Sequence, residues 1–390
     1  RKGVFLFIMK DSTKTIHIGS EPDFTKTGDV VTPLHFSSTF ARKKVSEPTA
    51  GLEYSRSGNP TRLALERNLA VLEHARYAFT YSSGLAAVTN ILFLLKAGDE
   101  ILSVDDVYGG TRRLFTKAFE QFGIKTSFVP FSKGGELANH ISEKTKMIWI
   151  ETPTNPLLKI IDIANVAEAA HKKDVLVVID NTFATPIFQK PLDLGADIVT
   201  HSMSKYINGH SDVIGGTVML SDKSIAEKLR FFQNAIGAVL SPFDSYQILR
   251  CIKTLPLRMQ QHETNAKKVV SFLQSHPKVK KIYYPGLKSH AGHTIAKKQM
   301  SGYGGMISFE LDGDIHAAIK FLESLHLIAI AESLGAVESL IEHPASMTHA
   351  SVPREEREKI GLSDTLIRLS VGLEDADDII KDLSDALERV

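Results

Sequence analysis

One lysine stands close to two serines in the segment 197–216, which reads DIVTHSMSKYINGHSDVIGG. The segment begins with apolar residues typical of a buried strand, and Ser202, Ser204 and Lys205 follow directly. Open α/β sheets bind their ligands at this end of their strands. The amine of Lys205 could form an imine with an aldehyde cofactor and later act as a base, and the two hydroxyls could bind a phosphate. The alternative is a surface lysine on a loop.

Polar residues also follow four earlier predicted strands. These strands cover residues 78–81, 100–104, 147–150 and 175–179, and the polar residues after them are Ser83, Tyr108, Asn155 and Asp180. The carboxyl ends of parallel strands meet at one edge of a sheet, so these side chains should converge with Lys205. Together they supply phosphate donors, a stacking ring, a carboxylate for a pyridinium nitrogen and an amine for an aldehyde. That set suits pyridoxal 5′-phosphate (PLP), although a single aspartate at a strand end often only caps a helix.

The turn Ser82-Ser83-Gly84 separates a short strand from an apolar helix expected from Leu85 to Leu95. Free backbone N–H groups and the positive end of a helix dipole face such a turn, which favours an anion. An ordinary turn capped by serine is the alternative.

Two arginines are further candidates for binding anions. Arg56 lies with Tyr54 in EYSRSGNPT, just before a helix that Asn59 and Pro60 are suited to begin. Arg368 lies among apolar residues, and its forked guanidinium suits a substrate carboxylate. The alternatives are arm residues that pack on the surface and an internal salt bridge.

The elements that position these residues alternate between strand and helix, with helices expected at 113–122 and 163–172. Such alternation predicts an α/β fold with a mostly parallel sheet. After residue 245 the pattern changes to a helix at 244–275 that breaks near Pro256, strands at 279–284 and 305–311, and a helix at 315–324. We therefore divide the chain into an N-terminal extension and extended arm (1–60), a large domain (61–244) and a smaller α+β domain (245–390).

Composition excludes several classes of function. The 390 residues carry a net charge of +1, which suggests neither nucleic acid nor an anionic membrane as a partner. Dinucleotide and P-loop glycine motifs are absent from the sequence, which disfavours a nucleotide-binding protein. A single cysteine, Cys251, indicates a reducing compartment, so we expect a cytoplasmic protein.

The apolar N-terminal run and a pair of histidines are not expected to be functional sites. The apolar run VFLFIM, from Val4 to Met9, lacks a cleavage site and is interpreted as an extension, with Met9 as a possible start. His290 and His293 have no cysteine or carboxylate cluster near them in the sequence, so no metal site is expected.

Several long segments resemble one known family. They are TIHIGSEPD, YSRSGNPT, SSGLAA, DDVYGGT, ETPTNP, DNTFATP, SMSKYINGHSDVIGG, KTLPLRM, ESLGAVESL and TLIRLSVGLED. From about Thr15 to its end, the chain resembles the PLP-dependent enzymes of cysteine and methionine metabolism, the group of the cystathionine γ-lyases and γ-synthases.

The resemblance implies the type I PLP fold, with a large domain on a parallel-rich sheet and a smaller C-terminal domain. It implies that Lys205 forms the imine, that Asp180 pairs with the pyridinium nitrogen and that Tyr108 stacks on the ring. The residues that it assigns to the phosphate are Gly84, Leu85, Ser202 and Ser204, next to Ser83 of the predicted turn.

The same resemblance assigns residues to the substrate and to a neighbouring subunit. Asn155, Ser333 and Arg368 would handle the substrate carboxylate or a cofactor oxygen. Tyr54 and Arg56 would reach the phosphate of the neighbouring subunit, so we expect dimers with shared sites, assembled into a homotetramer.

Four details bear on which reaction of the family to expect. Gly110 stands where methionine γ-lyases have a cysteine, and Glu332 resembles the cystathionine enzymes, where it could bind the distal amino group. The segment EYSRSG resembles the lyases more than the synthases, whereas Arg112 departs from the family pattern. We expect γ-elimination of cystathionine to cysteine, 2-oxobutyrate and ammonia in trans-sulfuration. The alternatives are a γ-synthase that joins an O-acyl homoserine to cysteine and a non-catalytic PLP-fold binding protein.

Overall fold

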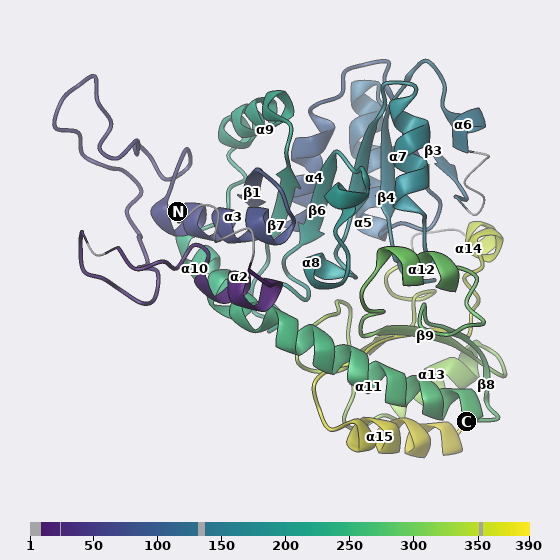
Figure 1. Cartoon of the computed structure of the whole chain (residues 1–390). Helices are drawn as coiled ribbons and strands as arrows, with labels where there is room; N and C mark the ends of the chain where they lie inside the picture. Colours follow the sequence, from purple (N-terminus) through teal and green to yellow (C-terminus); the bar gives the residue numbers. More distant parts are fainter. Residues whose placement is uncertain (1–8, 24, 132–136, 351–353) are drawn as a thin grey trace.

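The computed structural model of the chain describes residues 9–23, 25–131, 137–350 and 354–390. Of the apolar run from Val4 to Met9, only Met9 is among them. Two β-sheets organise the molecule, and helices cover the larger sheet on both of its faces (Figure 1). No helix in the described part of the chain is both long and apolar enough to cross a membrane.

The larger sheet has the strand order β1-β7-β6-β5-β4-β2-β3. Its strands are β1 (Tyr77–Tyr81), β2 (Glu100–Val104), β3 (Lys125–Val129), β4 (Thr145–Glu151), β5 (Leu176–Asp180), β6 (Ile198–Ser202) and β7 (Gly216–Leu220). All pairs are parallel except the two that β7 makes, with β1 and with β6. Central strands such as β5 read as continuous apolar runs because helices bury both faces. The predicted α/β fold with a mostly parallel sheet is confirmed.

The helices of the large sheet are α3 (Pro60–Leu72), α4 (Gly84–Leu92), α5 (Gly109–Arg113), α6 (Leu137–His140), α7 (Ile163–His171), α8 (Thr185–Phe188) and α9 (Lys223–Ile236). Four of them, α3, α4, α7 and α9, begin at a residue whose side chain caps them. Asn59 accepts hydrogen bonds from the first turn of α3, as predicted. The helix expected at 113–122 begins earlier, at Gly109, and continues from α5 through a π-helix (Leu114–Phe119) and a 3₁₀ turn (Glu120–Phe122). A further 3₁₀ turn covers Pro191–Leu194.

The smaller sheet has the order β10-β11-β12-β9-β8. Its strands are β8 (Val279–Tyr283), β9 (Met306–Leu311), β10 (Ala329–Ile330), β11 (Leu340–Glu342) and β12 (Leu366–Ser370). Around it lie α11 (Leu255–Ser275), α12 (His293–Gln299), α13 (Ile315–Glu323), α14 (Arg354–Ile360) and α15 (Ala376–Glu388). α10 (Pro242–Cys251) and a 3₁₀ turn (Ile252–Thr254) precede α11, and α10 packs against α3 beside the larger sheet.

The break expected near Pro256 is present. The 3₁₀ turn separates α10 from α11, and Pro256 lies in the first turn of α11, where its missing N–H costs no hydrogen bond. The boundary that we place between residues 244 and 245 falls inside α10, and we keep the two-domain division as a proposal.

The arm differs from the extended segment that we expected for residues 11–60, because it begins with the helix α2 (Asp11–His17). The buried amide of Asn68 donates to the carbonyl oxygens of Lys14, Thr15 and Ile18, which holds the end of α2 against α3. This tertiary contact explains a helix that the local pattern did not predict. The following residues form a long excursion at the side of the molecule (Figure 1), with Phe36, Val45 and Tyr54 exposed.

Candidate active site

The edge of the large sheet at the carboxyl ends of β4, β5 and β6 carries three polar residues in neighbouring positions, two of which the sequence predicted. Glu151 and Asp180 end β4 and β5 and are register partners, and Ser202 ends β6. Lys205 lies in the turn that follows β6. The strand ends thus place a lysine, two carboxylates and a serine at one edge.

Lys205 is largely buried, and its Nζ donates to Ser333 Oγ across 2.7 Å. Burial lowers the pKa of the Lys205 amine to about 8, and the positive charge of Arg368 acts in the same direction. Part of the amine is therefore neutral near physiological pH, as a nucleophile or a base requires.

Asp180 accepts two hydrogen bonds on the same oxygen. Its Oδ1 receives the backbone N–H of Thr182 at 3.0 Å and the Thr182 hydroxyl at 2.5 Å. The backbone N–H of Ser202 in turn donates to Thr182 Oγ1 at 2.9 Å. The aspartate therefore has a fixed orientation, although burial raises its pKa.

The turn before α4 brings four of the predicted phosphate residues together. An added Cβ on Gly84 would lie 3.2 Å from Ser202 Cβ, and one on Gly216 only 2.2 Å from the Ser83 carbonyl oxygen. The Ser83 hydroxyl accepts the Ala86 N–H at 3.0 Å, so its side chain caps the helix, as our alternative held. The N–H groups of Gly84 and Leu85 lie in the first turn, where an α-helix has no acceptors of its own. Ser204 Oγ accepts the Gly215 N–H at 3.0 Å.

Tyr108 is the N-cap residue of α5, and the residue is 41% exposed. Its backbone N–H donates to Glu151 Oε2 at 2.9 Å. The ring lies against Gly110, because an added Cβ there would be 2.4 Å from Tyr108 Cε1. We did not identify Glu151 from the sequence, although a charged residue at the end of an apolar strand was a usable signal.

Arg368 on β12 joins the two sheets and gathers the predicted substrate residues. Its Nη1 donates to Asn155 Oδ1 at 2.9 Å, and its Nη2 donates to the Ser333 carbonyl oxygen at 2.6 Å. Nη1 also pairs with Glu342 Oε1 at 2.9 Å, with both side chains buried. The internal salt bridge that we held as the alternative is therefore present, and Glu342 is a residue that sequence reasoning missed.

Ser333 adopts an uncommon backbone conformation between Lys205 and Arg368. Its φ is +93°, which costs a residue other than glycine on the order of 1–3 kcal/mol. Its hydroxyl accepts from Lys205 and its carbonyl oxygen accepts from Arg368. Glu332, which precedes it, is exposed beside the site. Burial raises the pKa of the Tyr108 hydroxyl, and of the nearby charges Arg113 lowers it and Glu332 raises it.

Tyr54 and Arg56 do not join this cluster within the single chain. Arg56 Nη1 donates to the Asn234 carbonyl oxygen near the end of α9 at 2.9 Å, and its guanidinium lies 5.6 Å from the Tyr54 ring centroid. Asn234 also binds the hydroxyl of Ser57. The arm thus fixes both side chains on the outer surface of the molecule.

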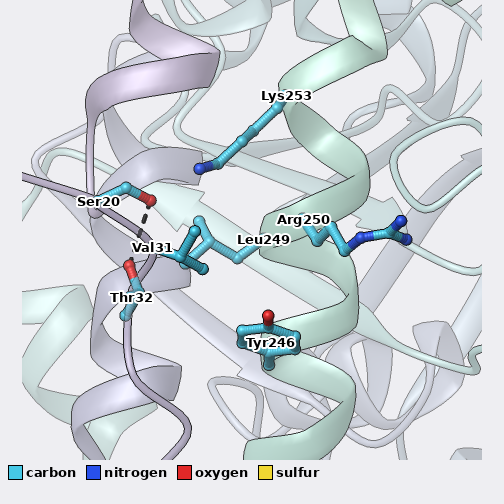
Figure 2. A pocket seen from close by; sticks show the side chains of 7 residues that line it. All are labelled: Ser20, Val31, Thr32, Tyr246, Leu249, Arg250 and Lys253. Atoms are coloured by element: carbon cyan, nitrogen blue, oxygen red, sulfur yellow. Dashed lines mark hydrogen bonds between the residues drawn. The ribbon is translucent and has the colours of Figure 1, made fainter. Parts of the chain in front are cut away.

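A cavity elsewhere in the described part of the chain has a different lining. A cavity of about 210 Å³ lies between the arm and α10 (Figure 2) and is lined by Ser20, Val31, Thr32, Tyr246, Leu249, Arg250 and Lys253. Lys253 points toward the arm and Arg250 away from it, and no carboxylate is among these residues. Within residues 9–23, 25–131, 137–350 and 354–390, no three His, Cys, Asp or Glu side chains are placed to bind one metal ion.

Comparisons with known proteins agree with this geometry. Residues 12–388 match a family described as Cys/Met metabolism PLP-dependent enzyme. Cystathionine gamma-lyase of Dictyostelium discoideum is 53% identical over 380 residues, 97% of this chain and 98% of that protein. Cystathionine beta-lyase of Coxiella burnetii is 52% identical, over 96% of this chain and 97% of that protein.

A solved structure is similarly close. That of cystathionine gamma-lyase from Lactobacillus plantarum, complexed with L-serine, has a TM-score of 0.94 at 48% identity and covers 98% of this chain and 99% of its own. The predicted type I PLP fold and the predicted cofactor are thereby confirmed. The chain belongs to the PLP-dependent enzymes of cysteine and methionine metabolism and is an enzyme of the carbon–sulfur lyase type.

Proposed function

We propose that this enzyme catalyses the γ-elimination of L-cystathionine to cysteine, 2-oxobutyrate and ammonia. The observation that carries the proposal is the exposed carboxylate of Glu332, next to Ser333 and near Tyr108 and Lys205. A carboxylate there suits a substrate with a second ammonium at its far end, as cystathionine has. Full-length relatives named cystathionine gamma-lyase, at about half identical residues, support the choice of the lyase reaction.

The strand-end residues suit PLP as the resident cofactor. We assign the phosphate to the N–H groups of Gly84 and Leu85 and to the hydroxyls of Ser202 and Ser204. We keep Ser83 as a phosphate ligand through its backbone only, because its hydroxyl is used by the helix. When bound, PLP supplies an aldehyde and a ring that accepts the electron pair released at the substrate Cα.

The remaining chemistry belongs to three side chains. Lys205 would hold the cofactor aldehyde, and its Nζ, partly neutral because its pKa is lowered, would take the α-proton of the substrate. Asp180 holds the pyridinium proton, since its fixed carboxylate is available at this edge. Tyr108 would stack on the cofactor ring.

Arg368 and Asn155 are assigned to the substrate α-carboxylate. Arg368 Nε has no hydrogen-bond partner among the described residues, so a carboxylate that reached this edge of the guanidinium would supply one. The ion pair with Glu342 keeps Arg368 charged while no substrate is present. The internal salt bridge and the substrate role are thus compatible.

The absence of a side chain at Gly110 affects which substrate fits the site. A residue with a Cβ at this position would push the Tyr108 ring away from its present place. We therefore propose that Gly110 preserves the space and ring position that cystathionine needs, and that methionine is a poor substrate.

We further propose a dimer with shared sites within a homotetramer. The projecting arm carries Tyr54 and Arg56 on its surface. Asn234 binds Arg56, whose guanidinium lies near the Tyr54 ring, and both side chains would face another subunit. A cytoplasmic location is proposed from the single cysteine, Cys251, which is buried and free.

Product analysis tests the proposed reaction. Purified enzyme should convert L-cystathionine to cysteine and 2-oxobutyrate, whereas β-elimination would give homocysteine and pyruvate. In parallel, O-acyl homoserine and cysteine are supplied together, and cystathionine is measured. If this second reaction has the higher kcat/KM, the enzyme is a γ-synthase, and if pyruvate predominates it is a β-lyase. A protein that binds PLP without any product would be a binding protein.

A further inference from the structure

Glu151 is a buried carboxylate that the proposed reaction does not use. It is 5% exposed, ends β4 and lies in register with Asp180 at the end of β5. Register partners on neighbouring strands have Cα atoms about 4.8 Å apart and side chains on the same face. Two carboxylates this close in a buried place rarely both ionise, so they share one proton between them.

Hydrogen-bond donors decide which of the two carboxyls keeps that proton. Asp180 receives two donors, the N–H and the hydroxyl of Thr182. Glu151 receives one, the backbone N–H of Tyr108 at 2.9 Å. Donors favour the ionised form of a carboxyl, so the negative charge belongs on Asp180.

The charged and titratable groups that face Glu151 agree with this division. Burial raises the pKa of Glu151 well above its usual value, and the negative charge of Asp180 raises it further. Asp106, from the segment after β2, also raises it, whereas Arg368 on β12 lowers it.

We infer that Glu151 is a positioning residue that keeps its proton at neutral pH and fixes Tyr108 through the Tyr108 backbone N–H. With Glu151 neutral, Asp180 is the single anion of the pair. The Glu151 carboxyl oxygen that accepts the Tyr108 N–H fixes the start of α5 and hence the position of the Tyr108 ring. The role of that ring beside the cofactor rests on the proposed function. The protonation of Glu151 does not, because it follows from the protein alone.

Substitutions of Glu151 distinguish the effect of its charge from the effect of its size and hydrogen bond. Glu151→Gln resembles the neutral carboxyl in size and keeps an oxygen for the Tyr108 N–H, but it cannot ionise. Glu151→Ala removes the acceptor, and Glu151→Asp serves where the alanine variant fails to fold. Glu100→Gln is the matched control, because Glu100 lies on the neighbouring strand β2, where it accepts from Ser127 and Ser142.

The first measurement is the unfolding temperature of the full-length protein against pH, with and without PLP. A group whose folded pKa lies above its unfolded pKa binds more protons in the native state, so stability falls as pH rises from about 4.5 to the folded pKa. Glu151→Gln removes that fall, and its unfolding temperature relative to the wild type should increase with pH across this window. A difference that stays constant with pH would overturn the inference.

In the control, the pH dependence of stability has the opposite sign. Burial raises the pKa of Glu100, but the hydroxyls of Ser127 and Ser142 lower it more, so the pKa lies below its usual value. The stability that Glu100 contributes is therefore present above about pH 4.5 and is lost as pH falls through its folded pKa. The difference between Glu100→Gln and the wild type should change only in that acidic range.

The second measurement compares kcat, KM and the absorbance of bound PLP. Glu151→Gln should keep kcat within about threefold, whereas Glu151→Ala should lose about 10- to 100-fold in kcat and shift the cofactor band, as expected when a buried N–H loses its acceptor. If Glu151→Gln is as damaging as Asp180→Asn, Glu151 acts as an anion and the inference fails. If Glu151→Ala lowers only the unfolding temperature, Glu151 does not position Tyr108. If the wild type forms no 2-oxobutyrate, the proposed function is contradicted. The unfolding data would still show whether Glu151 is protonated.

Discussion

The rate at which cofactor-free protein captures PLP should follow the protonation of Lys205. Only the neutral amine attacks an aldehyde, and burial together with the charge of Arg368 lowers the pKa of Lys205 to about 8. The neutral fraction is then about one tenth at pH 7, one half at pH 8 and nine tenths at pH 9. We therefore expect the capture rate to rise roughly tenfold between pH 7 and pH 9 and then to level.

An ordinary lysine predicts a different curve. With a pKa near 10.4, the neutral fraction would rise roughly a hundredfold between pH 7 and pH 9 and would continue to rise above pH 9. The assay mixes cofactor-free protein with PLP and follows the absorbance of lysine-bound PLP over time at each pH. Borohydride reduction and peptide mapping then identify the labelled lysine, and Lys205→Ala is the control. A hundredfold rise without levelling, or label on another lysine, would refute the reasoning.

Three further predictions concern single side chains. Asp180→Asn should lower kcat about a hundredfold or more, because a fixed charge partner is lost, and near-normal turnover would show that the assignment is wrong. Glu332→Ala should reduce kcat/KM for cystathionine about fivefold to a hundredfold, because a charge-assisted hydrogen bond to the distal ammonium is lost. Elimination from an O-acyl homoserine, which has no distal ammonium, should be unaffected, and equal losses on both compounds would count against that contact. Arg56→Ala and Lys205→Ala, each inactive alone, should regain activity when mixed and refolded together, because hybrid dimers hold one intact site. No recovery at any mixing ratio would argue against shared sites.

The strands and their polar ends could be predicted because the signals are local. The run VLVVI predicts a strand covered on both faces, and Asp180 follows it directly in the sequence. The helix at Pro60 was predictable for the same reason, since Asn59 is its cap. What local patterns do not contain is the order of the strands, such as the place of β7 between β1 and β6.

Contacts between distant residues were beyond prediction from single segments. Arg368 binds Asn155 across 213 positions of sequence, and Lys205 binds Ser333 across 128. The sequence suggested each residue separately, but the ion pair with Glu342 depends on the pairing of β11 with β12. Likewise, α2 is held by Asn68, and the local pattern of residues 11–17 gives no sign of a contact so far along the chain.

The partners of each ionisable group explain why similar residues do different work at this site. Lys205 is largely buried and has a neighbouring cation, Arg368, so its pKa is lowered and it loses its proton readily. Asp180 has two donors and carries charge, whereas Glu151 has one donor and an anionic neighbour and therefore keeps its proton. The amino acids that set these states, such as Thr182, do not themselves need to touch the substrate. Replacing Thr182 by valine would remove one donor from Asp180 and bring the two carboxyls closer in pKa, so the proton would be shared less unequally.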